Sequence, residues 1–166
     1  VDTREQDPLE FPKMAGVEVV QRALPVGDYA CVHRWKDTEC LDPVIIERKG
    51  ISDLFRSFSS SYEAEKAKLE KATALGLAYV LAIEASATEV LKGHTYWSGG
   101  EVKESQKSGL VMIRQLFSLC RRHGVSLWFC SSRREMAWRI QEFYLSWERM
   151  DVPPRCAPET QTLFLR

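Results

Sequence analysis

The 166-residue chain is predicted to form an α/β fold in which a central mixed β-sheet is flanked by helices. Short, continuous apolar runs at residues 44–46 and 78–83 are typical of strands buried on both faces. Residues 109–122 and 132–147 instead carry apolar side chains at helical spacing. This alternation of strand and helix patterns favours parallel pairing in the later part of the sheet.

The first third of the chain supplies the other expected strands. Residues 17–20 indicate a strand, residues 24–32 its hairpin partner, and residues 44–48 the central strand. The polar residues 35–39 indicate a loop. The chain is therefore expected to enter the sheet through a hairpin.

The helices are marked by their start and stop signals. Ser52 is expected to start a helix that runs through Phe58. Serine and glutamate three residues apart form capping-box patterns at residues 60–63, 86–89 and 132–135. Glycine is the expected stop of two helices, at Gly76 and Gly124. In the last helix one apolar stripe is expected, made of Met136, Ile140, Phe143 and Trp147.

Charged residues stand where two expected strands end. Asp28 follows Gly27 at the edge of one apolar segment, and Glu47, Arg48 and Lys49 continue the central strand. If the two strands pair, the carboxylates of Asp28 and Glu47 face each other. Because side chains alternate along a strand, Glu47 and Lys49 point to one side and Arg48 to the other.

This arrangement predicts a metal-dependent hydrolytic site for phosphodiesters. Two adjacent carboxylates repel unless a hard cation such as magnesium or manganese lies between them, and these ions prefer oxygen ligands. The backbone carbonyl of Arg48 can supply a third ligand. Lys49 can orient or deprotonate the attacking water and stabilise charge on the phosphate. The structural alternative is that Asp28 caps a turn while Glu47 and Lys49 form a solvated ion pair.

Three segments together resemble the nuclease domain of the xeroderma pigmentosum group F (XPF) family. They are residues 1–5, residues 24–29 with the Gly27-Asp28 pair, and residues 47–54, where Glu47-Arg48-Lys49 is followed after three residues by Asp53. The resemblance covers roughly residues 1–149, and its signature is intact in order and spacing. It implies a restriction-endonuclease-like core and a DNA endonuclease that acts with magnesium or manganese near flaps, forks or single-strand/double-strand junctions.

The resemblance also implies a role for each matching residue. Asp28 and Glu47 resemble the metal ligands, Lys49 the catalytic lysine, and Arg48 and Asp53 supports of the site. Asp2 matches an early acidic position, as a candidate further metal ligand, and Glu5 can share that position. Tyr62 resembles a family tyrosine on the helix after the signature.

Two other functions fit the same signature. One is a non-catalytic module that binds or scaffolds DNA junctions, and the other is a nuclease of the same core without structure selectivity. Most of the resembled nucleases carry a helix-hairpin-helix module after the core, which this sequence does not show. Substrate choice is therefore expected to depend on a partner, a second copy or residues 94–107.

Contacts with DNA are expected to rest on local patches, because Lys and Arg balance Asp and Glu at 23 each. Arg4 and Arg56 are the candidates for phosphate contacts. Lys66, Lys68 and Lys71 alternate with glutamates and are interpreted as a solvated helix face.

Residues 94–107 interrupt the helical and strand patterns and predict a long loop. Two interpretations of its aromatic residues stay open. Tyr96 and Trp97 can stack on an unpaired base at a junction, or they can pack back on the domain.

The chain divides into a nuclease-like domain, residues 1–150, and a proline-rich tail, residues 151–166. The resemblance implies a homodimer or heterodimer through the late helices, and the apolar end of the tail is a candidate docking peptide for a sliding clamp. No apolar run reaches the roughly 18 residues that a membrane helix needs, so an intracellular protein is expected, cytoplasmic if prokaryotic or viral and nuclear if eukaryotic. Because Val1 lies inside an expected strand, leading residues or an upstream domain can precede it.

Overall fold

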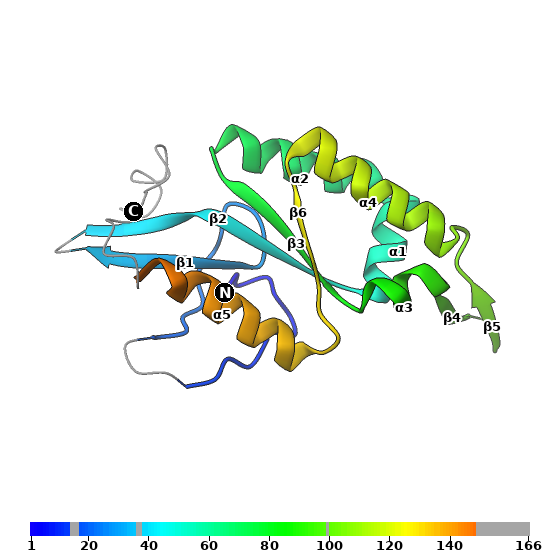
Figure 1. Cartoon of the computed structure of the whole chain (residues 1–166), viewed down its shortest axis with the longest axis horizontal. Coiled ribbons are helices and arrows are strands. Elements are labelled where there is room, and N and C mark those ends of the chain that lie inside the picture. Colours follow the sequence, from blue (N-terminus) through cyan, green and yellow to red (C-terminus); the bar gives the residue numbers. More distant parts are fainter. Residues whose placement is uncertain (14–16, 36–37, 99, 149–166) are drawn as a thin grey trace.

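A four-stranded mixed sheet forms the centre of the computed structural model, which describes residues 1–13, 17–35, 38–98 and 100–148 (Figure 1). The strand order is β1 (Tyr29–Trp35), β2 (Thr38–Gly50), β3 (Ala78–Glu84) and β6 (Ser126–Phe129). β1 is antiparallel to β2, whereas β2, β3 and β6 run parallel. The predicted α/β class with a central mixed sheet is confirmed.

Helices cover both faces of this sheet (Figure 1). One face packs against α1 (Ile51–Ser60), α2 (Tyr62–Ala74), α3 (Ala87–Lys92) and α4 (Gly109–His123). The other face packs against α5 (Arg133–Glu148) and the N-terminal segment.

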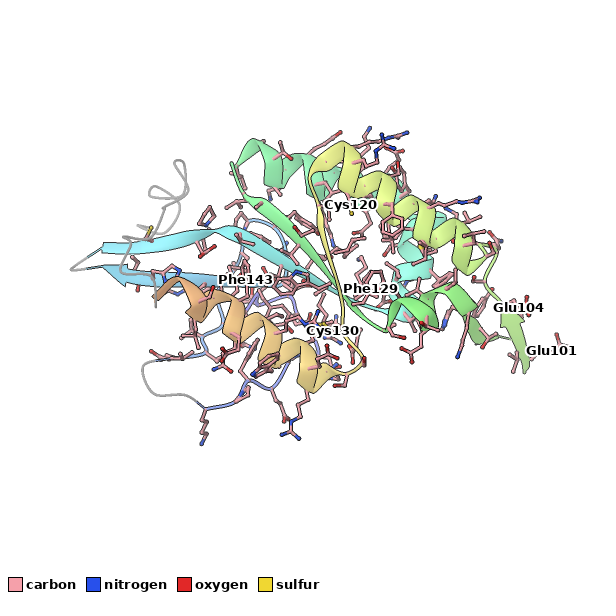
Figure 2. The ribbon with its side chains drawn as sticks, in the orientation of Figure 1. Glu101, Glu104, Cys120, Phe129, Cys130 and Phe143 are labelled. Atoms are coloured by element: carbon pink, nitrogen blue, oxygen red, sulfur yellow. The ribbon has the colours of Figure 1, made fainter. Side chains whose placement is uncertain are left out.

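At the end of β6, successive side chains pack into the hydrophobic clusters on opposite faces of the sheet. Phe129 packs in the cluster under α4, whereas the next residue, Cys130, is fully buried in the cluster under α5 (Figure 2). Successive side chains of a strand point to opposite faces, so β3 and β6 need apolar residues at nearly every position.

Most helix signals are confirmed. Ser86 accepts a hydrogen bond from the Glu89 N–H in a complete capping box, and Gly124 ends α4 in the left-handed conformation at φ 65°. The capping box predicted at residues 60–63 is wrong, because α1 runs through Ser60 and the N-cap of α2 is Ser61, whose side chain makes no cap bond.

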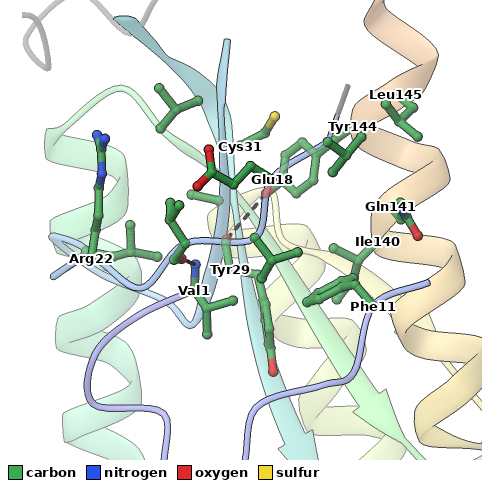
Figure 3. A pocket seen from close by; sticks show the side chains of 16 residues that line it. Val1, Phe11, Glu18, Arg22, Tyr29, Cys31, Ile140, Gln141, Tyr144 and Leu145 are labelled. Carbon is green, nitrogen blue, oxygen red and sulfur yellow. Dashed lines mark hydrogen bonds between the residues drawn. The ribbon is translucent and has the colours of Figure 1, made fainter. Parts of the chain in front are cut away.

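The strand predicted at residues 17–20 does not form. This segment lines an apolar cavity of about 200 Å³ together with residues of β1 and Tyr144 of α5 (Figure 3). The valines at positions 17, 19 and 20 favour an extended chain, but a strand also needs a neighbour within hydrogen-bonding distance. β1 therefore pairs with β2 instead.

Two segments predicted as loops contain strands. β1 extends to Trp35 and β2 begins at Thr38, while residues 36–37 lie outside the described part. Within residues 94–107, β4 (Thr95–Ser98) pairs with β5 (Glu101–Glu104) as a small separate hairpin, and Figure 2 labels the two ends of β5, with Glu101 at the tip. Polar composition was a poor guide here, because a solvent-facing hairpin needs backbone pairing but little apolar surface.

The strand β6 was not predicted from the sequence, although residues 125–130 are largely apolar and follow Gly124. It is only four residues long and exists through parallel pairing with β3. In the described part of the chain, no helix combines the length and apolar character that crossing a membrane requires.

Candidate active site

A tight turn places Asp28 against the end of β2. Asp28 directly precedes β1, and its N–H donates to the carbonyl of Ile46 at 2.9 Å. Its Oδ2 accepts from the N–H of Arg48 at 2.8 Å. Gly27 makes this approach feasible, because its φ is +77° and a Cβ there would lie 2.0 Å from Cγ2 of Ile45. These contacts hold Asp28 beside the two residues that flank Glu47 in β2, and the role predicted for the pair stays a prediction.

Glu47 and Lys49 share one face of β2, as alternation predicted. The Lys49 ammonium lies 3.3 Å from Glu47 Oε1 and 2.9 Å from Glu65 Oε1. Lys68 also donates to Glu47 Oε1 and lies 3.7 Å from Glu65. Glu47, Lys49 and Glu65 are buried and the Lys68 side chain is 40% exposed, so this is a largely buried network of two carboxylates and two ammonium groups rather than a solvated ion pair.

Sequence reasoning missed Glu65 and Lys68. The interpretation of Lys68 as part of a solvated helix face is wrong, because its ammonium turns inward to Glu47. One feature of the sequence indicated that these two side chains face the protein interior. Glu65 and Lys68 are three residues apart and so share a face of α2 with the buried Leu69 and Ala72 close by.

Burial and other carboxylates near Asp28 raise its pKa. Burial first, and then the charge of Glu47, raise the pKa of Asp28 to about 7, with a smaller contribution from Glu5. Burial likewise raises the pKa of Tyr79, assisted by the charges of Glu47, Glu65 and Asp28. The site therefore holds carboxylates close together in a place where water stabilises them poorly, which is an arrangement that a cation would relieve.

Arg48 points to the opposite side of β2. Its guanidinium lies 3.2 Å from Glu84 Oε2 and 3.3 Å from Glu5 Oε1, and it donates to the carbonyl of Asp7 at 2.6 Å. The side chain thus joins the N-terminal segment to the end of β3. These contacts fit the expected supporting role, and they place the Glu5 carboxylate on Arg48.

Asp2 is buried, and both of its carboxylate oxygens accept hydrogen bonds. Its two oxygens accept four hydrogen bonds, three from the backbone N–H, Nε and Nη2 of Arg4 and one from the Leu24 N–H. The bonds from Arg4 hold the pKa of Asp2 at about 2. A carboxylate offers about four acceptor positions, so a metal bound to Asp2 would have to displace a donor. Arg4 itself is largely exposed and stays a candidate for phosphate contacts.

The remaining candidates lie along α1, α2 and the hairpin. Asp53 and Arg56 form an exposed ion pair at 2.5 Å on α1. Tyr62 packs its ring against Phe58, with centroids 6.2 Å apart. Tyr96 is 44% exposed on β4, and the side chain of Trp97 lies outside the described part. The roles predicted for these residues stay predictions.

The donors present fit a magnesium or manganese ion. Among the described residues, no group of three or more His, Cys, Asp or Glu side chains is arranged to hold a metal. Magnesium is nevertheless commonly bound by one or two carboxylates, with water and substrate phosphates as the other ligands. Asp28 and Glu47 supply such a pair, and the Arg48 carbonyl is the predicted third protein ligand.

Comparison with known proteins agrees with this architecture. The sequence model of the ERCC4 domain matches residues 1–143. The structure of XPF from Aeropyrum pernix has a TM-score of 0.56 and 22% identity, covering 91% of this chain and 66% of that chain. The structure of XPF from Aeropyrum pernix in complex with DNA has a TM-score of 0.50 and 19% identity, covering 85% and 59%.

This chain thus spans less than two thirds of either solved XPF chain. No curated protein sequence matches it. The family match extends over most of the chain, and the fold likeness confirms the resemblance seen in the sequence signature. The chain belongs to the ERCC4 domain family, with the fold of an XPF nuclease domain.

Proposed function

We propose that this protein is a divalent-metal-dependent DNA endonuclease that hydrolyses phosphodiester bonds near flaps, forks or other junctions. The observation that supports it best is the partly buried carboxylate of Asp28 beside the buried Glu47, with the Lys49 ammonium on the same face of β2 as Glu47. Membership of the ERCC4 domain family favours the same function, and one solved structure with this fold is described as a complex with DNA.

The proposed roles follow from the contacts. Asp28 and Glu47 would hold a magnesium or manganese ion, which supplies positive charge to a phosphate oxygen and lowers the pKa of a water. Lys49, fixed between Glu47 and Glu65, donates hydrogen bonds toward the phosphate as negative charge grows on it. Arg4, whose pKa is raised chiefly by Asp2 and also by Asp28 and Glu47, is exposed near this centre and can contact a neighbouring phosphate.

Structure selectivity and assembly are part of the proposal. The formal charge is balanced over the whole chain, so local features must select the junction. Dimerisation through the late helices remains an expectation, and α4 exposes Leu110 and Phe117, which a second chain could cover. Residues 151–166, with the predicted clamp-docking peptide, lie outside the described residues.

The test is cleavage of labelled forked, flapped and linear DNA in magnesium, manganese or chelator. Lys49→Ala is compared with Lys66→Ala, because Lys66 is a half-exposed lysine of α2 that pairs with Glu70 at 3.6 Å. Metal-dependent cutting at the branch, lost in Lys49→Ala and kept in Lys66→Ala, is the expected result.

Three other results would change the conclusion. Equal cutting of all substrates would leave a nuclease without structure selectivity. Tight branch binding without cutting would favour a scaffold module. Cutting that persists in chelator would contradict the metal-dependent proposal.

A further inference from the structure

A second concave site lies beside the proposed catalytic centre. It is a cavity of about 390 Å³ between the outer face of α1 and the β4–β5 hairpin. Asp53, Phe55 and Arg56 line it from α1, and His94 and Tyr96 line it from the hairpin side. Because α1 begins at Ile51, directly after the signature strand, the cavity lies at the same end of the sheet as the catalytic residues.

One buried polar atom in this region has no partner. Nε2 of His94 is buried and makes no hydrogen bond with the described residues. Leaving a buried polar group unsatisfied costs about 1–3 kcal/mol, so such an atom points to a partner supplied from outside the chain. The His94 ring lies between Phe55 and Tyr96, with centroids 5.8 Å and 6.5 Å away, which holds this atom in place.

The lining fits a flat ligand with polar edges. Tyr96 is 44% exposed and stacks on His94 at an interplanar angle of 22°, so its ring is available to extend the stack. The ionic side chains of the lining are the pair Asp53 and Arg56, whose charges balance, so a neutral group suits the interior better than an ion. The volume lies in the range of roughly 300–1,000 Å³ that is usual for small-molecule sites.

We propose that this cavity receives one unpaired nucleobase of the bound DNA strand, stacked on Tyr96 and hydrogen-bonded to His94. This inference rests on the proposed function, and it explains how a core of balanced charge would recognise a junction. A base in a duplex is stacked and paired, whereas a base next to a branch is free to enter. Arg56 at the rim is placed to contact the phosphate of the same nucleotide.

Fluorescence of 2-aminopurine tests the inference without cleavage. The base analogue is placed at successive positions of the single-stranded arm of a forked DNA, and binding is measured in chelator. We expect quenching at one or two positions nearest the branch. Tyr96→Ala should remove this quenching and weaken binding of the fork about 5- to 100-fold.

Two further variants separate the base site from general effects on the hairpin. Val102→Ala changes an exposed residue of β5 outside the cavity, and it should keep both the quenching and the affinity. His94→Phe keeps an aromatic ring but removes Nε2, so it should keep the quenching and weaken binding. Thermal melting of each variant shows whether the fold is retained.

An abasic substitution at the quenched position provides the decisive comparison. It should weaken wild-type binding to the level of Tyr96→Ala and have no further effect on that variant. Wild type that binds abasic and normal forks equally well would overturn the inference, even if cleavage is normal. Deoxyadenosine monophosphate that binds the free protein through Tyr96 as tightly as the fork does would also overturn it, in favour of a free-nucleotide site. Quenching that depends on Tyr96 in a protein that never cuts DNA would keep the base site and reject the nuclease.

Discussion

Asp2 and Asp28 are adjacent acidic residues with opposite environments. The Asp2 N–H donates to the Asp28 carbonyl at 2.8 Å, so the two lie at the same end of the molecule. The Asp2 carboxylate receives four hydrogen bonds, and its pKa is lowered to about 2. Among the described residues the Asp28 carboxylate receives one, from Arg48, and burial beside Glu47 raises its pKa to about 7. A carboxylate surrounded by donors is part of the scaffold, whereas one held against a second carboxylate is available to a cation.

The sharpest way to test this contrast is to neutralise the Asp28–Glu47 pair. Asp28→Asn or Glu47→Gln should reduce metal-dependent cleavage about 100-fold or more, because each removes a proposed metal ligand while keeping the side-chain size. Single-turnover cleavage and a melting curve measure the two effects separately. Cleavage within about threefold of wild type in a folded variant would reject the pair as the catalytic centre.

The next largest expected effect is the dependence of the free energy of unfolding on pH. An unfolded Asp28 carboxyl titrates near 3.8 and the folded one near 7, so the metal-free folded state holds an extra proton between these values. The free energy of unfolding should therefore fall as pH rises from about 4 to about 7, by about 4 kcal/mol at most, and then level off.

Denaturant titrations over this pH range, compared with Asp28→Asn, check the slope. The variant should show a flatter profile. Magnesium should raise the melting temperature more at pH 8 than at pH 5, since only the ionised pair binds it well. A metal effect that is the same at both pH values would contradict this account.

Asp2→Asn should lower the stability of the fold without changing the magnesium requirement of cleavage. The amide cannot accept all four hydrogen bonds, so the free energy of unfolding should fall by about 2 kcal/mol. The magnesium concentration that gives half-maximal cleavage should stay the same. An unchanged stability together with a higher magnesium requirement would instead make Asp2 a metal ligand.

The smallest expected effect concerns Glu65. Glu65→Gln weakens the 2.9 Å contact that holds the Lys49 ammonium, and cleavage should slow about 10-fold while substrate binding changes little. Glu70→Gln on the same helix removes an exposed glutamate and should have no effect. Equal rates in both variants would show that Lys49 needs no support from α2.

Local patterns predicted most of the elements that place the site. Most residues of the apolar runs that became β2 and β3 are buried between helices, so their composition left few alternatives. Residues 17–20 and 94–107 were mispredicted because their composition left more than one structure possible. Each depends on whether another backbone segment lies beside it, and composition carries little information about that.

The sequence by itself determined the order Gly27-Asp28, Glu47-Arg48-Lys49 and, through alternation, the separation of Arg48 from Glu47 and Lys49. Only the tertiary structure decided which charges share the enclosed space. Glu65 reaches Lys49 and Lys68 reaches Glu47 because α2 packs on the face of β2 that carries both, whereas Asp2 receives its donors from Arg4 and Leu24. Hydrogen bonds and burial set the state of a carboxylate, and the contacts from Leu24 and from α2 come from segments that are distant in sequence and adjacent in space.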